Sequence, residues 1–362
     1  EYSLAINKKT GVMTVKDAKG GKVIREVRFL PEKEGLCGEM RSFINEKYAD
    51  LKVADNGGGI IGDDNGKFGE VDKHEIPAAD AVSILSFSME DGERFYGGGS
   101  TSRDHIQHRG EFLRMWTTYQ QTEIPMPFMM SSRGWGVYNN STHKSFFDIG
   151  NQQKSKFNII NTFDEADFFL MMGKDMPAIL NEYTLVTGRT YVLPKWAYGL
   201  CFGPNMREEQ FDILNDAVRF RQFDVPCDVF WLEPQWMEKR YDFSTKKKWN
   251  YDRFSPEPYW LQDQYPKTMH NRLFIGKLRS MGFHLGLWLC EEYDLSIQEE
   301  DIIAERTGGK LSGQEHWMDH LTVFMDQGVE GFKLDPARTI DNHTNWEYYN
   351  GRTDKEMHNL NQ

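Results

Sequence analysis

The stretch that decides the fold of the second half of the chain is GVEGFKLDPAR, residues 328–338. A glycine precedes a short apolar run, and the run stops at Asp335 because Pro336 cannot continue a central strand. The pattern predicts a buried strand with a carboxylate at its C-terminal end. Side chains two residues apart share a face of a strand, so we expect Lys333 and Asp335 to project into one space. Charged groups at a buried strand end are usually paired or functional, so a structural ion pair is the alternative to a functional site.

Three further strands are predicted before this one, each followed by a stretch with helical spacing. The strands lie at residues 197–202, 227–232 and 284–289, and the helices at residues 207–223, 273–281 and 317–327. Three of the four strands end in carboxylates, namely Glu233, Glu291 or Glu292, and Asp335. Catalytic residues of parallel α/β folds gather at the carboxyl ends of the strands. No glycine-rich dinucleotide fingerprint follows the first strand, so the series predicts a (β/α)8 barrel rather than a Rossmann sheet.

The barrel is expected to be incomplete, because a (β/α)8 domain takes roughly 250 residues and four parallel strands cannot close. We therefore expect residues 189–362 to hold about the first half of a TIM-type barrel. Either the natural protein continues past Gln362 or another structure covers the open strands.

Residues 1–188 show short β-rich runs separated by turn clusters, which predict an antiparallel β-sandwich. The runs lie within residues 2–29 and at residues 82–89, 135–139, 144–149 and 166–171. Helical spacing at residues 177–187 ends at Gly188, where we place the domain boundary. The predicted fold class is thus multidomain β plus α/β, with an N-terminal antiparallel β-sandwich followed by a truncated (β/α)8 barrel.

Composition narrows the ligand class. The formal net charge of -12 and the pI near 5.4 argue against a nucleic acid as partner, and an uncharged ligand is more natural. Aromatic residues make up 14% of the chain, which suits sugar rings but also fits ordinary aromatic cores. The four cysteines lack metal-ligand spacing, and we expect neither a metal nor an organic cofactor.

No apolar run reaches the length of a membrane span. The chain starts at Glu1 without a methionine, and trimming would remove any targeting segment. We expect a secreted or periplasmic protein rather than a cytoplasmic one, and the sequence makes no prediction of its oligomeric state.

Motifs spread over most of the chain, in matching order and spacing, resemble glycoside hydrolase family 31, the α-glucosidase and α-xylosidase family. They are ERFYGGG at 93–99, PFMMSSRGWGV at 127–137, LPKWAYGL at 193–200, WLEPQWM at 231–237 and the stretch at 328–335. The resemblance implies an N-terminal β-sandwich followed by a (β/α)8 catalytic barrel, in agreement with the pattern of strands and helices.

The resemblance also implies roles for single residues. Asp335 matches the family's catalytic nucleophile, and Lys333 matches a neighbour that contacts the bound sugar. Glu233 stands where the family usually has a sugar-binding aspartate, and Trp288 matches the third-strand tryptophan of the sugar subsite. A lysine beside Asp335 is expected to keep that carboxylate ionised, which suits a nucleophile.

Two further residues are candidates for substrate binding. Trp236 belongs to the aromatic loop that follows the second strand. Arg114 lies in residues 103–121, a predicted loop that either reaches over the barrel mouth, as sandwich loops of the resembled family do, or has a purely surface role.

The predicted function is retaining, exo-acting hydrolysis of a terminal α-linked sugar through a covalent β-glycosyl-aspartate intermediate. In the resembled family the acid/base is an aspartate beyond the fourth strand, so we expect it past Gln362. The identity of the sugar is left undecided, because Glu233 and the sequence after Asp335 depart from the family pattern. Glucosides, xylosides, galactosides and other α-glycosides all remain candidates. A lyase, a transglycosylase and a non-catalytic carbohydrate-binding protein of the same fold are the alternatives.

Overall fold

The computed structural model describes residues 2–32, 35–48, 76, 80–101, 105–117, 124–204, 209–254, 274–290, 296–334, 348–351, 353–357 and 359. Contacts divide the chain into two units, Glu1–Thr190 together with Ile340–Gln362, and Tyr191–Thr339. The break between Thr190 and Tyr191 lies two residues from the boundary predicted at 188. By contacts, the described residues after 340 group with the first unit.

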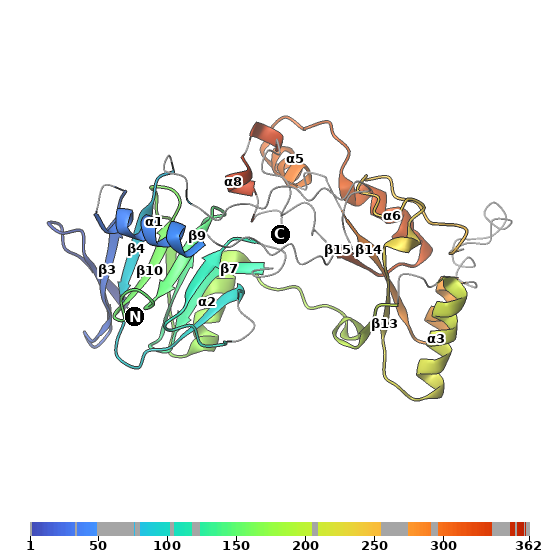
Figure 1. Ribbon diagram of the computed structural model, residues 1–362, viewed down its shortest axis with the longest axis horizontal. Coiled ribbons are helices and arrows are strands. Elements are labelled where there is room, and N and C mark those ends of the chain that lie inside the picture. Colours follow the sequence, from blue (N-terminus) through green and yellow to red (C-terminus); the bar gives the residue numbers. More distant parts are fainter. Residues whose placement is uncertain are drawn as a thin grey trace. The chain divides into compact units, whose positions relative to one another are not determined.

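The first unit is built on two antiparallel sheets, as predicted (Figure 1). The larger sheet has the order β1 (Tyr2–Ile6), β2 (Met13–Asp17), β3 (Lys22–Leu30), β4 (Ser83–Ser88), β10 (Lys156–Asn161), β9 (Ser145–Ile149) and β6 (Phe112–Met115). The smaller sheet has the order β11 (Phe168–Met172), β8 (Trp135–Asn139), β7 (Ile124–Ser131) and β5 (Phe95–Ser100). Hydrogen-bonded neighbours in both sheets run antiparallel.

The core of the sandwich lies between the two sheets. Phe87 and Phe157 of the larger sheet pack against Trp135 and Phe95 of the smaller one, and the Phe87 and Trp135 rings stack at 5.4 Å. The residues are fully buried. Alternation of apolar side chains along the strands therefore fills one shared layer, which is the physical basis of the sandwich.

Two helices cover the outer faces of the sandwich. α2 (Met176–Thr187) was predicted, and it places Ile179 and Tyr183 against Phe128, whose ring stacks on Tyr183 at 4.0 Å. α1 (Gly35–Tyr48) was not predicted, although Cys37, Met40 and Ile44 recur at helical spacing and pack on the larger sheet. α8 (Asp354–Met357) and a 3-10 turn, η5 (Tyr349–Gly351), belong to this unit as well.

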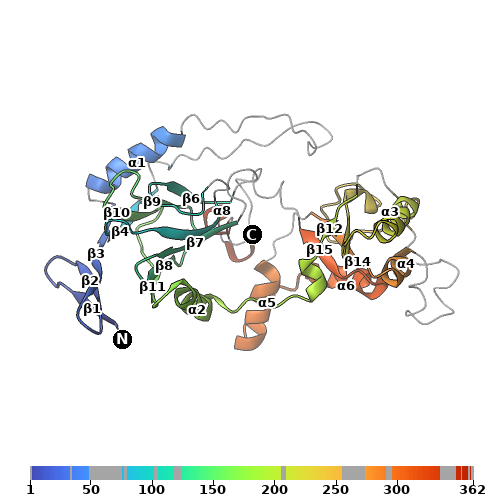
Figure 2. The same ribbon diagram turned by 90° about the horizontal axis from the view of Figure 1, so that it is seen from below.

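The second unit contains four parallel strands in sequence order, as the repeat predicts. They are β12 (Cys201–Phe202), β13 (Val229–Leu232), β14 (His284–Leu289) and β15 (Gly331–Leu334). The helices between them are α3 (Gln210–Gln222), α4 (Phe274–Ser280), α5 (Ser296–Thr307) and α6 (Trp317–Gln327). Figure 1 shows α3 and α6 beside this sheet, and Figure 2 shows α4 there as well. The arrangement is that of the first part of a (β/α)8 barrel.

Helices α3, α4 and α6 pack on one face of the parallel sheet. Phe230 and Leu232 of β13 and Leu285 and Leu287 of β14 point to this face and share a buried cluster with Ile213, Ala217, Leu278, Leu321 and Phe324 of the helices. α6 ends at Gly328 in the left-handed conformation, with φ of 108°, as the glycine predicts. Among the residues that the structure describes, no helix is long and apolar enough to cross a membrane.

Two predictions for this unit are wrong in detail. Residues 195–198 form a 3-10 turn, η1 (Lys195–Tyr198), and only Cys201 and Phe202 pair with β13, so the first strand is shorter than predicted. The turn is held in place because the Trp196 indole stacks on the His284 ring at 4.0 Å. α5 was missed altogether, since its sequence SIQEEDIIAERT has only a weak apolar stripe.

Candidate active site

The register of the parallel strands places three predicted site residues in one row. Trp288 pairs with Lys333 across β14 and β15, and Leu232 pairs with Leu287 across β13 and β14. Glu233 follows Leu232 directly, so it stands at the level of Trp288 and Lys333. The row lies at the carboxyl ends of the strands, where the sequence predicts the site.

Two members of the row, Glu233 and Lys333, belong to the sheet face that the helices leave open. Successive side chains of a strand point to opposite faces of the sheet. Leu232, Leu287 and Phe332 pack against the helices, and each is adjacent in sequence to a member of the row. Glu233 and Lys333 therefore project to the inner face, which is the interior side of a (β/α)8 barrel.

Lys333 and Glu233 form an ion pair across this row. The Lys333 Nζ lies 3.6 Å from Glu233 Oε1, and the exposed fractions of the two side chains are 48% and 25%. Gly203, after β12, also borders Glu233, because a Cβ at Gly203 would lie 3.7 Å from Oε1. One acceptor and one donor thus face solvent together, which is the chemistry needed to bind the hydroxyl groups of a sugar.

The two predicted tryptophans are joined to each other. Trp236 lies in a 3-10 turn, η2 (Pro234–Trp236), and its Nε1 donates a 2.7 Å hydrogen bond to the backbone carbonyl of Trp288. Trp236 is fully buried against Trp249 and Phe324. This bond fixes the end of β14, so Trp236 supports the row from the core, and its direct contact with a sugar stays a prediction.

Trp288 itself is nearly buried, with 4% of its surface exposed. The Tyr241 ring meets its indole edge to face at 5.6 Å, and Tyr241 has the unusual φ of 55°. The role of Trp288 in a sugar subsite stays a prediction.

Two other predicted carboxylate positions cannot be placed. Asp335 lies outside the described residues, as do Glu291 and Glu292. The expected proximity of Lys333 and Asp335 therefore stays a prediction, and the partner that the structure gives Lys333 is Glu233.

Arg114 is not on a loop, and that expectation is wrong. It lies on β6 opposite Phe146 of β9, and only 4% of its surface is exposed. Across the larger sheet, Phe146 pairs with Ile160, and Ile160 pairs with Ile84; these residues pack under α1. Arg114 thus faces the outer side of the larger sheet, and strand pairing rather than a surface loop decides its environment.

One aromatic residue of this face was not among the predicted site residues. Trp231, two residues before Glu233, is half-buried, and its ring lies against Gly286 on the adjacent strand β14 and Gly331 on β15, the strand after that. Glycines inside strands mark a close approach by another group, and this signal was available in the sequence.

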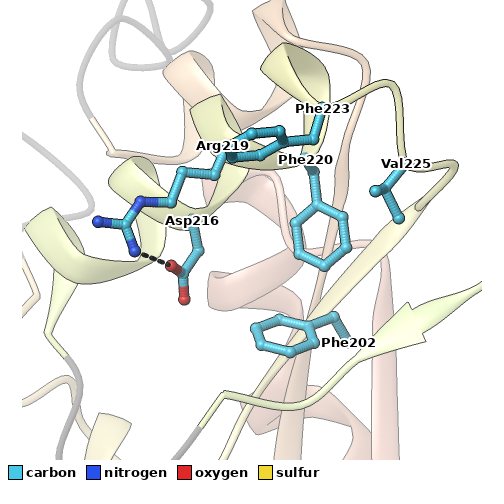
Figure 3. Close-up of a pocket in the computed structure, with 6 residues that line it drawn as sticks. All are labelled: Phe202, Asp216, Arg219, Phe220, Phe223 and Val225. Atoms are coloured by element: carbon cyan, nitrogen blue, oxygen red, sulfur yellow. Dashed lines mark ion pairs between the residues drawn. The ribbon is translucent and has the colours of Figure 1, made fainter.

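A separate hollow of about 220 Å³ lies on the helix side of β12 (Figure 3). Asp216 and Arg219 form an ion pair at 3.9 Å on its rim, and Phe202 and Phe220 wall it. The Phe202 side chain points to the helix-packed face of the sheet, so this hollow is distinct from the row that contains Glu233. The full lining is Phe202, Asp216, Arg219, Phe220, Phe223 and Val225.

An ionic cluster stands at the opposite end of the strands. Glu330, just before β15, contacts both Arg279 and His284 Nδ1. Burial raises the pKa of Glu330, but the hydrogen bonds from Arg279 and His284 outweigh it, and the pKa lies below its ordinary value. Active sites of (β/α)8 barrels form at the carboxyl ends of the strands, and this cluster lies at their amino ends, so we place it outside the site. The part of the chain that the structure describes has no group of three His, Cys, Asp or Glu residues able to hold a metal ion.

The family assignment follows from two matches. Residues 2–148 match the glycosyl hydrolase 31 N-terminal galactose mutarotase-like domain, and residues 190–362 match the glycosyl hydrolases family 31 TIM-barrel domain. The chain belongs to glycoside hydrolase family 31. The fold and the resemblance predicted from the sequence are thereby confirmed.

Similar proteins in family 31 are enzymes with longer chains. An α-xylosidase of Emericella nidulans is 22% identical over 334 residues, covering 83% of this chain and 40% of that protein. An α-xylosidase of Saccharolobus solfataricus is 27% identical over 319 residues, covering 81% and 40%. The solved structure of a Flavobacterium johnsoniae family 31 dextranase complexed with glucose matches with a TM-score of 0.65 and 18% identity, covering 99% of this chain and 42% of that one. The chain thus spans about 40% of the length of these relatives, and the solved structure supports the fold alone.

Proposed function

We propose that this chain provides the sandwich and the first half of the barrel of a retaining exo-α-glycosidase. The observation that carries the proposal is the row in which the Lys333 ammonium lies 3.6 Å from the Glu233 carboxylate at the carboxyl ends of parallel strands. Membership of family 31 and the α-xylosidase relatives support a glycosidic substrate.

In the proposed reaction, Asp335 is the nucleophile. A carboxylate oxygen of Asp335 attacks the anomeric carbon, the bond from that carbon to the leaving oxygen breaks, and the leaving oxygen takes a proton from an acid. Water then attacks the same carbon, gives its proton to the conjugate base of that acid, and releases Asp335 as a carboxylate. Two inversions restore the α configuration. We assign the acid to no residue of this chain.

Lys333 and Glu233 have positioning roles in this proposal. The ammonium of Lys333 donates to sugar hydroxyls and places positive charge near the nucleophile, while Glu233 accepts hydrogen bonds from hydroxyls. Holding the ring in a near-attack geometry accelerates the first step without chemistry by these residues. A second contribution of Glu233 is to orient Lys333 before substrate arrives.

The proposed substrate class is a terminal α-linked pyranose with a free non-reducing end. α-Xylosides come first, because both curated relatives described above are α-xylosidases, and α-glucosides come second. Glu233 is one methylene longer than the aspartate that the family resemblance leads us to expect, which shortens the space available to the sugar in front of it.

Covalent labelling tests the proposal on the 362-residue chain. An α-xylosyl or α-glucosyl fluoride carrying a further fluorine on the ring needs no acid to expel its leaving group, and the second fluorine slows hydrolysis of the ester. We expect intact mass to rise by one glycosyl unit and peptide mapping to place it on Asp335. The matched control, Asp335→Asn, should stay unlabelled.

Three outcomes contradict the proposal in different ways. A label on Glu233 or Glu292 moves the nucleophile to another residue. Saturable sugar binding without any label identifies a non-catalytic carbohydrate-binding protein. An unsaturated sugar released during turnover indicates a lyase.

A further inference from the structure

Trp231 occupies the inner face of the barrel unit in a way that two glycines permit. A Cβ added to Gly286 of β14 would lie 2.2 Å from both Cε3 and Cζ3 of the Trp231 indole, closer than any real contact. A Cβ on Gly331 of β15 would lie 2.9 Å from Cη2, at the far edge of the same ring. One indole therefore starts from β13, crosses the adjacent strand β14 and reaches β15, the strand beyond it.

The level of this indole relative to the site is given by the strand register. Trp231 pairs with Gly286, and Gly286 pairs with Gly331. Glu233, Trp288 and Lys333 stand two residues further along the same strands, which is about 6.6 Å nearer the carboxyl ends. Trp231, Gly286 and Gly331 thus form the row directly beneath the row with the ion pair.

The indole has no packing role on the helix side. Its neighbours in sequence, Phe230 and Leu232, are the fully buried residues of that core. Trp231 has the opposite parity and is only half-buried, so one surface of a large aromatic ring faces the interior of the barrel. Aromatic faces pack well against the apolar faces of pyranose rings.

We infer that Trp231 is the floor of the sugar-binding site. The indole closes the barrel beneath Glu233 and Lys333, and the depth that remains above it accepts one monosaccharide ring. The two glycines serve this role, because any side chain at Gly286 or Gly331 would lift or tilt the ring toward the sugar. This inference rests on the proposed function and specifies how its site limits the substrate to a terminal residue.

The packing is tested by a mutant cycle on the 362-residue chain. Gly331→Ala should lower the unfolding temperature by roughly 5 °C, because the new Cβ collides with the outer edge of the indole. Trp231→Phe removes that edge, so Gly331→Ala in the Trp231→Phe background should cost little. Gly38→Ala is the control substitution, since nothing lies within 4 Å of a Cβ there.

The floor itself is tested by isothermal titration calorimetry with methyl α-D-xylopyranoside and methyl α-D-glucopyranoside. Trp231→Ala should weaken binding of the sugar that the wild-type chain prefers by about tenfold. The double variant Trp231→Phe with Gly331→Ala should recover the unfolding temperature but not the affinity. If Trp231 had only a structural role, the double variant would regain the unfolding temperature and the affinity together.

The outcomes separate this inference from the proposed function. If the wild-type chain binds neither glycoside, the proposed function fails, and the floor fails with it. If the wild-type chain binds and Trp231→Ala binds equally well, the floor alone is refuted. If Gly331→Ala is as stable as the wild type and binds as well, the indole does not lie across β15 in solution.

Discussion

Replacing Lys333 with methionine should separate sugar binding from stability. The Nζ to Oε1 distance of 3.6 Å corresponds to a Coulomb energy of about 1 kcal/mol in bulk water and about 5 kcal/mol at an effective dielectric constant of 20. Almost half of the lysine side chain is exposed, so the aqueous value applies, and measured exposed pairs contribute about 0.2 to 1 kcal/mol. Lys333→Met should therefore lower the free energy of unfolding by less than about 1 kcal/mol.

The same substitution should weaken sugar binding much more. A hydrogen bond to a charged group contributes about 1.5 to 3 kcal/mol, which is roughly 10- to 150-fold in affinity. Urea unfolding measures the first quantity, and calorimetric titration with methyl α-D-xylopyranoside measures the second. Lys246→Met is the matched control, because Lys246 forms an ion pair with Glu315 at 3.2 Å in the same unit, away from the row.

Two results would refute this reasoning. A loss of more than about 2 kcal/mol of stability in Lys333→Met would mean that the ion pair is structural. Equal affinity in Lys333→Met and the wild type would mean that the ammonium does not contact the sugar.

Two further predictions concern stability. Hydrogen bonds from Ser312 and His316 lower the pKa of Asp301 from 3.8 to about 2, so their stabilisation is complete above pH 4 and is lost as the pH falls toward 2. Acid unfolding followed by circular dichroism should show a shallower loss between pH 4 and 2 in Asp301→Asn, and an unchanged profile would contradict the assignment. The Asp175 side chain accepts a 2.9 Å hydrogen bond from the Ala178 amide at the start of α2, so Asp175→Ala should cost about 1 kcal/mol in urea unfolding while Asp175→Asn should be nearly neutral. Equal losses in both variants would rule out the cap.

Strands with a clear alternation or a continuous apolar run were predictable at the level of single residues. β8 and β14 have the bounds predicted from the sequence, because glycine or Asn/Ser punctuation flanks compact apolar runs. α6 was predicted to end at Gly328 for the same local reason. Weakly patterned elements such as α1 and α5 were missed, since tertiary contacts rather than a strong apolar stripe stabilise them.

The common level of three predicted residues at the strand ends was predictable, but their contacts were not. Strand ends and the family resemblance placed Glu233, Trp288 and Lys333 together, and the register confirms that they share one row. The pairing of Lys333 with Glu233 depends on side chains two strands apart, and no local pattern reports that distance.

The sequence by itself determined the order of sandwich and barrel, the parallel strands and the charged residues at their carboxyl ends. Those features arise from local periodicity and from residue types that end strands. The tertiary structure alone decided that Arg114 is buried on a sheet face and that Trp231 lies across Gly286 and Gly331. Both depend on which residues stand opposite each other across strands, and pairing register is a property of the folded sheet rather than of any one segment.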